Sequence, residues 1–279
     1  MVQGKTIQLY LPDGNPKGIK KCKINESIGR AIFIPRNELD KAKKFEELQQ
    51  QGVYFLIKKE DEEKFKFYIG EAESLIQRVL QHDNPDKEWN YVICFYSATN
   101  NINKAHVKFL ESLCYKKINE LGRQDLVNGN CPPQPKITEE EENLLLSFFE
   151  EMRILIGVLG YPIFEEIKKA QTEEEIFYCR RKSIEAKGNL TEEGFVIYKG
   201  SHAEIQNRPS SNQSINTLRD SLINTGVLKK EEESFIFTED YVSSSPSMAA
   251  AIITGGNENG WIVWKNKEGK TLDELKRKK

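Results

Sequence analysis

The residues best suited to chemistry in this chain are two tyrosines in two short, similar motifs. Tyr54 closes the tripeptide Gly52-Val53-Tyr54, and Tyr68 opens the tripeptide Tyr68-Ile69-Gly70. A phenol donates and accepts hydrogen bonds, and it becomes a useful base near neutral pH only if nearby positive charge lowers its pKa from about 10. The pair therefore predicts a place where protons are handled, with a cation close by.

Two further residues could supply that cation and a second titratable group. Arg78 lies eight residues after Gly70, and His82 lies four residues after Arg78, so a helix would point both side chains the same way. A guanidinium binds phosphate oxygens, and an imidazole exchanges its proton near neutral pH. The functional interpretation is a phosphate clamp beside a proton-handling group. The alternative is a solvated arginine and a histidine at the edge of the core.

Glu111 is the best candidate for binding a metal ion. It lies four residues after Val107 and three before Cys114, at the edge of the apolar stripe of a predicted helix. A carboxylate there is costly unless it is paired, hydrogen bonded or bound to a cation. Mg²⁺ is typically held by one or two carboxylates, with water and phosphate oxygens completing its shell, and Mn²⁺ is the alternative ion. The other interpretation is a boundary glutamate that reaches solvent.

These side chains fall on four of five predicted elements. Alternating apolar runs predict strands, and apolar residues at helical spacing predict helices. Strands are expected at Gly52–Ile57, Phe65–Ile69 and Tyr91–Tyr96, and helices at Ser74–His82, with Ser74 as N-cap, and at Lys104–Leu121. The charged run Lys58–Lys64 separates the first two strands, so a β-hairpin is expected to bring the two phenols together.

The flanking segments carry other recognisable signals. Before the hairpin, strands are expected at Ile7–Leu11 and Ala31–Ile34, and a helix over residues 37–50. Thr138, with Glu141 three residues later, predicts a capping box at the start of an acidic helix. In the last third, we expect a strand at Gly194–Tyr198, a helix at Thr217–Thr225, Ser247 as a helix cap and Asn259-Gly260 as a hairpin turn.

The order and spacing of these residues resemble the GIY-YIG nuclease family. The resemblance covers about residues 50–135 and rests on Tyr54, Tyr68, Arg78, His82 and Glu111, followed by Asn128 or Asn130 in a loop. It implies a three-stranded antiparallel sheet flanked by helices. One departure is Glu71, where some branches of the family carry a lysine. That puts a lysine-assisted mechanism in doubt unless Lys64, Lys66 or Lys104 substitutes.

The resemblance also implies a mechanism for hydrolysing phosphodiester bonds in DNA. Glu111 would hold Mg²⁺ or Mn²⁺, and Arg78 would neutralise charge on the phosphoryl oxygens. Tyr54 is the implied general base, His82 would take or relay its proton, and Tyr68 would position the water or a phosphate oxygen. The loop asparagine, either Asn128 or Asn130, would orient a neighbouring group.

The last third resembles a small domain of unknown function that is often fused to GIY-YIG nucleases. The matching stretches run from Ser245 to Ala250 and from Asn259 to Lys265. Similar modules are linked with restriction systems and proposed to sense modified DNA. Trp261 and Trp264 are interpreted as core residues, or as a surface on which bases stack.

Composition limits the classes of protein that fit this chain. Its 279 residues include 38% hydrophobic and 30% charged residues, which is ordinary for a folded domain in water. No run of 18 apolar residues and no apolar signal core appear, so we expect a cytoplasmic protein without a membrane span. Five scattered cysteines without a CxxC pair predict reduced thiols and no zinc site. The net charge of −2 neither requires nor excludes a polyanion.

We therefore expect an α+β protein with three parts. Residues 1–50 form an N-terminal β and helical extension, 51–163 a GIY-YIG-like nuclease domain, and 164–279 a smaller α+β accessory domain for DNA recognition. The predicted function is a metal-dependent DNA endonuclease acting in repair or in defence against foreign DNA. Cutting both strands with one site per chain would require a dimer, but the sequence leaves the oligomeric state open.

Two other functions fit the same residues. One is a GIY-YIG scaffold that binds DNA or a protein without cutting. The other is an interaction protein whose acidic helix, residues 139–156, docks a partner. DNA affinity that falls with salt would separate both DNA-binding interpretations from the third.

Overall fold

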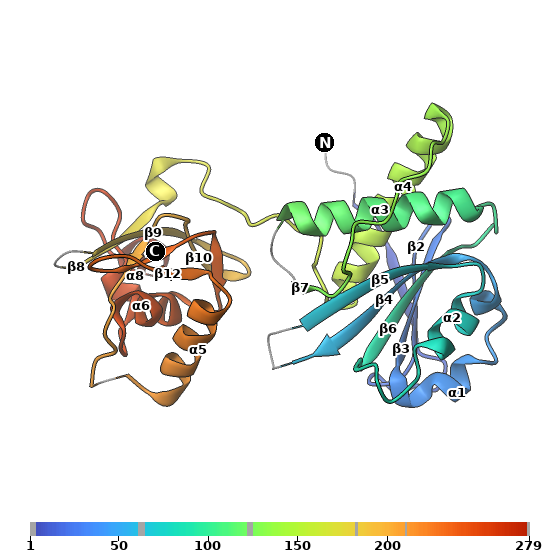
Figure 1. The fold of residues 1–279 in the computed structure, drawn as a ribbon. Coiled ribbons are helices and arrows are strands. Elements are labelled where there is room, and N and C mark those ends of the chain that lie inside the picture. Colours follow the sequence, from blue (N-terminus) through green and yellow to red (C-terminus); the bar gives the residue numbers. More distant parts are fainter. Residues whose placement is uncertain (1–3, 61–64, 122–124, 182–183, 210, 278–279) are drawn as a thin grey trace. The chain divides into compact units, whose positions relative to one another are not determined.

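The computed structural model describes residues 4–60, 65–121, 125–181, 184–209 and 211–277. The chain divides into two compact units, Met1–Glu166 and Ile167–Lys279 (Figure 1). Each unit mixes helices with antiparallel strands, which confirms the α+β class.

The N-terminal unit is built on one seven-stranded sheet. Its strands follow the order β1-β2-β3-β6-β4-β5-β7 across the sheet, and all neighbours are antiparallel except β5 and β7. The strands are β1 (Ile7–Tyr10), β2 (Lys20–Ile24), β3 (Gly29–Pro35), β4 (Gly52–Lys59), β5 (Phe65–Ala72), β6 (Tyr91–Ser97) and β7 (Asp125–Leu126).

Helices cover both faces of this sheet (Figure 1). The long helices α3 (Lys104–Leu121) and α4 (Glu139–Val158) lie on one face, over a core that contains Phe55, Phe67 and Phe95. The shorter helices α1 (Leu39–Ala42) and α2 (Leu75–Gln81) lie on the other, with the 3-10 turns η1 (Arg36–Glu38) and η2 (Glu46–Gln49), over Tyr54 and Leu56. Because neighbouring residues of a strand point to opposite faces, one strand serves both layers.

The sheet is larger than the three strands that the resemblance implied. Residues Gly29 to Pro35 pair along the whole of β6, from Ser97 to Tyr91, and β2 and β1 follow outward. The first fifty residues therefore contribute strands to the same sheet as β4 and β5. The strand β7 was not predicted, because a two-residue strand has no detectable apolar period.

Residues 37–50 do not form the single helix that was predicted. Leu39, Ala42 and Leu48 are all buried. Leu48 lies nine residues, about two and a half helical turns, after Leu39, so a continuous helix would point it to the opposite side. The chain instead turns extended at Phe45, which lets Leu48 reach the core that Leu39 shares.

The predictions for the other helices of this unit are mostly confirmed. α3 has the predicted bounds, and α4 begins with the capping box between Thr138 and Glu141. Ser74 occupies the N-cap position of α2, but its side chain makes no capping hydrogen bond.

The C-terminal unit has its own core between two small sheets and four helices. One sheet has the order β14-β10-β9-β8 and the other β11-β13-β12. The strands are β8 (Phe177–Arg181), β9 (Ile184–Thr191), β10 (Gly194–Ile197), β11 (His202–Ala203), β12 (Leu228–Lys230), β13 (Phe235–Phe237) and β14 (Tyr241–Ser243). The helices are α5 (Gln213–Asn224), α6 (Pro246–Thr254), α7 (Gly260–Val263) and α8 (Leu272–Lys276), and the turn η3 (Glu173–Glu175) precedes β8.

Two predictions about this unit were wrong in detail. Ser245, and not Ser247, caps α6 by accepting a hydrogen bond from the Met248 N–H. The Asn259-Gly260 pair starts helix α7 instead of turning a hairpin. A Cβ on Gly260 would lie 2.0 Å from the Pro246 carbonyl oxygen, so the glycine serves the close approach of α7 to α6.

The two tryptophans that followed this glycine have different surroundings. Trp264 is fully buried, stacks on Phe195 at 4.3 Å between ring centroids, and donates its indole N–H to the Pro246 carbonyl. It is therefore a core residue. Trp261 is half-buried, and the Arg277 guanidinium lies 3.6 Å from its ring centroid. A base could stack on the face of Trp261 that Arg277 covers only by displacing Arg277.

Two further sequence expectations can be compared with the structure. All five cysteines are free thiols, and only Cys131 is exposed. Among the described residues, no helix has the length and apolar character needed to cross a membrane.

Candidate active site

The hairpin of β4 and β5 places Tyr54 directly opposite Gly70. The Tyr54 ring lies over this glycine: a Cβ at position 70 would sit 2.3 Å from both Cζ and Oη of the phenol. Tyr68, two residues earlier on β5, points to the same face of the sheet. The ring centroids of Tyr54 and Tyr68 are 6.2 Å apart, so the hairpin does bring the two phenols together.

His82 lies against both phenols from the end of α2. Its ring centroid is 5.6 Å from that of Tyr54 and 5.3 Å from that of Tyr68. The Tyr54 hydroxyl and His82 Nε2 are hydrogen bonded at 2.8 Å, and both side chains are buried. The predicted pairing of these two residues is thus a direct contact.

Lys87 contacts the other ring nitrogen of His82. Its Nζ lies 2.6 Å from His82 Nδ1 and 5.9 Å from the Tyr68 ring centroid. Burial and the positive charges of Lys87 and Arg78 lower the pKa of His82 to about 4. The histidine is therefore neutral at physiological pH.

Arg78 is exposed on α2 and serves the phenols electrostatically. Its interaction with the Tyr54 hydroxyl raises the pKa of Arg78 and lowers the pKa of Tyr54. Burial is the larger influence on Tyr54, and together with Tyr68 it holds the pKa of this phenol well above its usual value. Tyr54 is therefore protonated at neutral pH in the protein alone, which opposes the predicted role as base.

Glu111 lies on α3, on the other side of β5, where strand alternation also directs Glu71. The Glu71 backbone N–H favours the charged form of the Glu111 carboxylate. Burial, followed by the charge of Glu71, raises the pKa of Glu111 to about 7, while Arg78 and Lys108 act in the opposite direction. Arg78 therefore influences both the phenols and this carboxylate, which places the five predicted residues around one region at the end of β5.

The two loop asparagines have different positions. Asn128 pairs its side chain with the Ile69 backbone: Oδ1 accepts from the Ile69 N–H at 2.9 Å, and Nδ2 donates to the Ile69 carbonyl at 2.8 Å. The Asn128 side chain thus continues the hydrogen bonding between β7 and β5, and it fixes the backbone of β5 between Tyr68 and Gly70. Asn130 is exposed in the loop.

Two of the three lysines proposed as substitutes at position 71 form ion pairs with acidic residues. Lys104 pairs with Glu73 at 2.8 Å, and Lys66 pairs with Glu60 at 2.7 Å. Lys64 lies outside the described residues. Lys87 contacts His82 in the site. The sequence did not predict this contact, because Lys87 lies in the loop after α2 and no periodic pattern indicates its position. Its one available signal was a cation five residues after a candidate histidine.

The donor set near Glu111 is suitable for Mg²⁺ or Mn²⁺. The charge of Glu71 raises the pKa of Glu111, and a divalent cation near both carboxylates would relieve this repulsion. Among the described residues, no group of three or more His, Cys, Asp or Glu side chains could hold a metal ion. One or two carboxylates fit an ion that keeps several waters and binds substrate phosphate.

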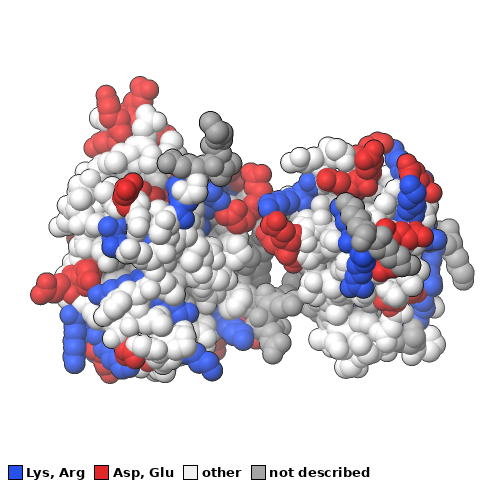
Figure 2. Space-filling model, turned by 180° about the vertical axis from the view of Figure 1, so that it is seen from behind, with Lys and Arg blue, Asp and Glu red and all other residues white. Residues whose placement is uncertain are grey.

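Charge on the surface is mixed. On the face shown in Figure 2, the described lysines and arginines lie interspersed with acidic residues, and acidic side chains gather at one projecting end of the N-terminal unit. The first turn of α4, Glu139 to Glu142, is acidic. This face therefore shows no broad positive field that would attract a polyanion.

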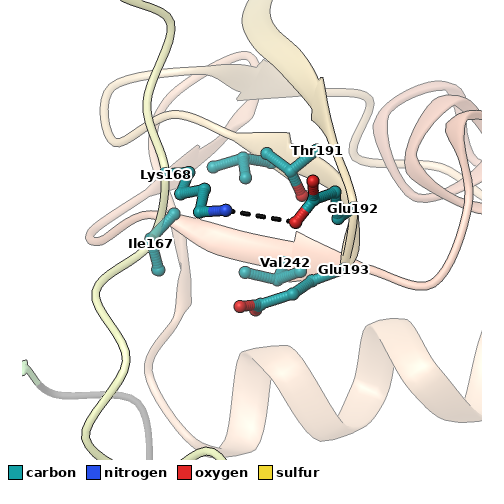
Figure 3. A pocket seen from close by; sticks show the side chains of 7 residues that line it. Ile167, Lys168, Thr191, Glu192, Glu193 and Val242 are labelled. Carbon is teal, nitrogen blue, oxygen red and sulfur yellow. Dashed lines mark hydrogen bonds and ion pairs between the residues drawn. The ribbon is translucent and has the colours of Figure 1, made fainter. Parts of the chain in front are cut away.

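The described part of the C-terminal unit contains a small hollow, shown in Figure 3. Ile167, Thr191 and Val242 line it, and Lys168 and Glu192 form an ion pair at 3.1 Å beside it. Its cavity volume of about 20 Å³ is enough for about one water molecule. It is too small for a nucleobase.

Comparison with known families identifies part of the C-terminal unit. Residues 177–276 match the family described as Domain of unknown function (DUF4357). This match supports the predicted domain of unknown function in the last third of the chain. No curated protein and no solved structure matches the chain. The family match does not extend to the N-terminal unit, and no GIY-YIG family model matches it.

Replacing Gly70 by alanine should disrupt the contact between β5 and Tyr54. The added Cβ would overlap the phenol, and overpacking of this kind costs about 1–3 kcal/mol. Gly129→Ala is the matched control, because its Cβ would meet no atom within 4 Å. Urea unfolding of both variants measures the difference, and equal stabilities would show that Tyr54 does not depend on this glycine.

Glu111→Gln should change how stability depends on pH. The folded pKa of about 7 lies above the ordinary value of 4.5, so the wild type loses stability as pH rises from about 4.5 to 7. The glutamine variant should lack this loss and be more stable at pH 8 by about 1–2 kcal/mol, less than the full shift because the carboxyl is partly solvated. Unfolding at pH 5 and pH 8, with Glu120→Gln as control, tests this. A parallel pH profile in wild type and variant would contradict it.

Proposed function

We propose that this chain is a DNA endonuclease of the GIY-YIG type, which hydrolyses phosphodiester bonds with Mg²⁺ or Mn²⁺. The observation that carries the proposal is the convergence of Tyr54, Tyr68, Arg78 and His82 at the end of β5, with Glu111 within electrostatic reach of Arg78. Packing alone does not require a guanidinium, two phenols, an imidazole and a half-buried carboxylate at one place.

Arg78 is the phosphate-binding group in this proposal. Its guanidinium is exposed while its charge reaches Tyr54, Tyr68 and Glu111. A planar guanidinium binds two phosphoryl oxygens at once, and it stabilises the negative charge that grows on them as water attacks. Lys108 adds positive charge on the side of α3.

Tyr54 is the proposed acceptor of the proton that the attacking water releases, in the form of the protein in which the phenol has first lost its own proton to solvent. Its oxygen is hydrogen bonded to His82, and the charge of Arg78 favours the phenolate. Burial opposes this charge and is the larger influence, so the substrate-free protein holds Tyr54 in its protonated form. Tyr68 lies 6.2 Å away by ring centroids and is the proposed group that orients the water or a phosphate oxygen.

Glu111 would hold the divalent cation, with Glu71 beside it. When bound, the cation would polarise the scissile phosphate and stabilise the leaving oxygen. Asn128 holds the Ile69 backbone and so keeps Tyr68 and Gly70 in place, which is an orienting role without contact to substrate. Asn130 has no assigned role in this mechanism.

The C-terminal unit is proposed to recognise the DNA target, including modified DNA. Its match to a domain of unknown function and its independent core support a separate task. The Arg277–Trp261 stack offers a cation and an aromatic face on the surface. We further propose that the protein acts in the cytoplasm, in repair or defence, and that cleavage of both strands requires two copies.

One observation favours a second candidate function, a GIY-YIG scaffold that binds DNA or a protein without cutting. The raised pKa values of Tyr54 and Glu111 weaken the phenol as a base and the carboxylate as a cation ligand. Incubating plasmid DNA with and without Mg²⁺ separates the two functions, because the scaffold would bind DNA and leave it intact.

Glu111→Ala should abolish metal-dependent cleavage, lowering the rate about 100-fold or more, because the cation would lose its carboxylate ligand. The fold should persist, since the side chain is only half-buried. The measurement is nicking of plain and modified plasmid DNA in Mg²⁺. Glu120→Ala, on the exposed end of the same helix, is the control. Undiminished cleavage by the Glu111 variant would overturn the assignment.

Tyr54→Phe should lower the cleavage rate about 100-fold while keeping the packing over Gly70, because only the hydroxyl is lost. Tyr10→Phe, at an exposed position of β1, serves as control. Single-turnover cleavage and thermal melting of both variants make the comparison. A wild-type rate in the Tyr54 variant would remove the phenol from the proton transfer.

A further inference from the structure

The two ring nitrogens of His82 contact two different groups, an ammonium and a phenol hydroxyl. Nδ1 lies 2.6 Å from Lys87 Nζ, and Nε2 lies 2.8 Å from the Tyr54 hydroxyl. The imidazole is 3% exposed. It is enclosed by Tyr54 from β4, Tyr68 from β5, Arg78 from α2 and Lys87 from the following loop. Both ring nitrogens therefore have their principal partners within the protein.

The number of protons decides the direction of both hydrogen bonds. An ammonium group has three donors and no acceptor, so Lys87 must donate to Nδ1. A neutral imidazole with an accepting Nδ1 carries its hydrogen on Nε2. Nε2 then donates to the Tyr54 oxygen, and the hydroxyl hydrogen of Tyr54 points away from the histidine.

The loop that carries Lys87 is held by contacts remote from the phenols. Arg36 donates to the carbonyls of Lys87 at 2.7 Å and Asn84 at 3.0 Å, and it pairs with Asp83 at 2.9 Å. The Trp89 indole N–H donates to the His82 carbonyl at 2.9 Å. The backbone on both sides of Lys87 is therefore fixed, so directing the ammonium toward Nδ1 costs only the entropy of its side chain.

We propose that Lys87 is a positioning residue that fixes His82 as the Nε2–H tautomer, so that the histidine serves Tyr54 as a hydrogen-bond donor. The consequence for catalysis rests on the proposed function. A donor to the Tyr54 oxygen stabilises the phenolate, whereas a histidine in this tautomer cannot take the Tyr54 proton. His82 therefore assists Tyr54 electrostatically and does not relay its proton.

The tautomer can be observed directly by nitrogen NMR of the full chain labelled with ¹⁵N-histidine. In the wild type, His82 should show a protonated Nε2 and an unprotonated Nδ1. Lys87→Met keeps the aliphatic stem but removes the donor, so both tautomers should become populated and the pKa of His82 should rise. Lys87→Arg should restore the single tautomer, and Lys117→Met on α3 should leave the spectrum unchanged. A protonated Nδ1 in the wild type, or an unchanged His82 spectrum in Lys87→Met, would overturn the proposal.

Cleavage of plasmid DNA gives a second, separate measurement. Lys87→Met should slow Mg²⁺-dependent cleavage about tenfold, the worth of one hydrogen bond, and Lys87→Arg should recover most of the rate. Melting temperatures establish that the variants are folded. If the wild type cuts no DNA, the proposed function fails while the NMR result still decides the tautomer. If the wild type cuts and Lys87→Met cuts equally fast, the positioning role fails and the nuclease assignment stands.

Discussion

The close approach between the Tyr54 phenol and the backbone of Gly70 is the contact on which the candidate site depends. It requires a residue without a Cβ at position 70 and a register that places Tyr54 opposite it. Given both, the phenol extends across β5 toward α2, where His82 meets its hydroxyl. A one-residue slip of the hairpin would send Tyr54 to the opposite face of the sheet. The chemistry of the site is thus set by strand pairing before any loop is considered.

The side chains of the candidate site lie on both faces of β5. Tyr68 and Gly70 face the layer of α2, while Glu71 follows Phe67 and Ile69 toward α3. The phenols and the imidazole therefore lie on one side and the carboxylates on the other. Arg78 influences both sides. This separation keeps the carboxylates away from His82, and burial together with the positive charges of Lys87 and Arg78 explains why that histidine is neutral.

The two units contrast in what they offer a ligand. The N-terminal unit gathers titratable groups at the end of one strand, whereas the described part of the C-terminal unit has a hollow too small for a base. Recognition by the C-terminal unit would therefore use its surface. Trp264, Phe195 and Gly260 serve its core, because the buried tryptophan and the absent Cβ let α7 pack against α6.

Local patterns in the sequence determined much of the secondary structure of this protein. Alternation and helical spacing predicted β4, β5, β6 and α3, and the capping residues predicted the start of α4, because each signal lies within a few neighbouring residues. The order of tyrosines, arginine, histidine and glutamate likewise selected residues that the fold brings together. The helix over residues 37–50 failed because burial of Leu48 outweighed local propensity.

Tertiary structure alone decided which partners these residues have. Lys87 reaches His82 because Arg36, from a distant part of the chain, holds the loop between them. Asn128 binds the Ile69 backbone because β7 lies beside β5, and Glu71 meets Glu111 because α3 packs on that face. Apart from the contact between Lys87 and His82, these contacts join residues tens of positions apart, and no local period records them. The sequence determined which chemical groups were present, and the packing of distant segments decided their protonation and their roles.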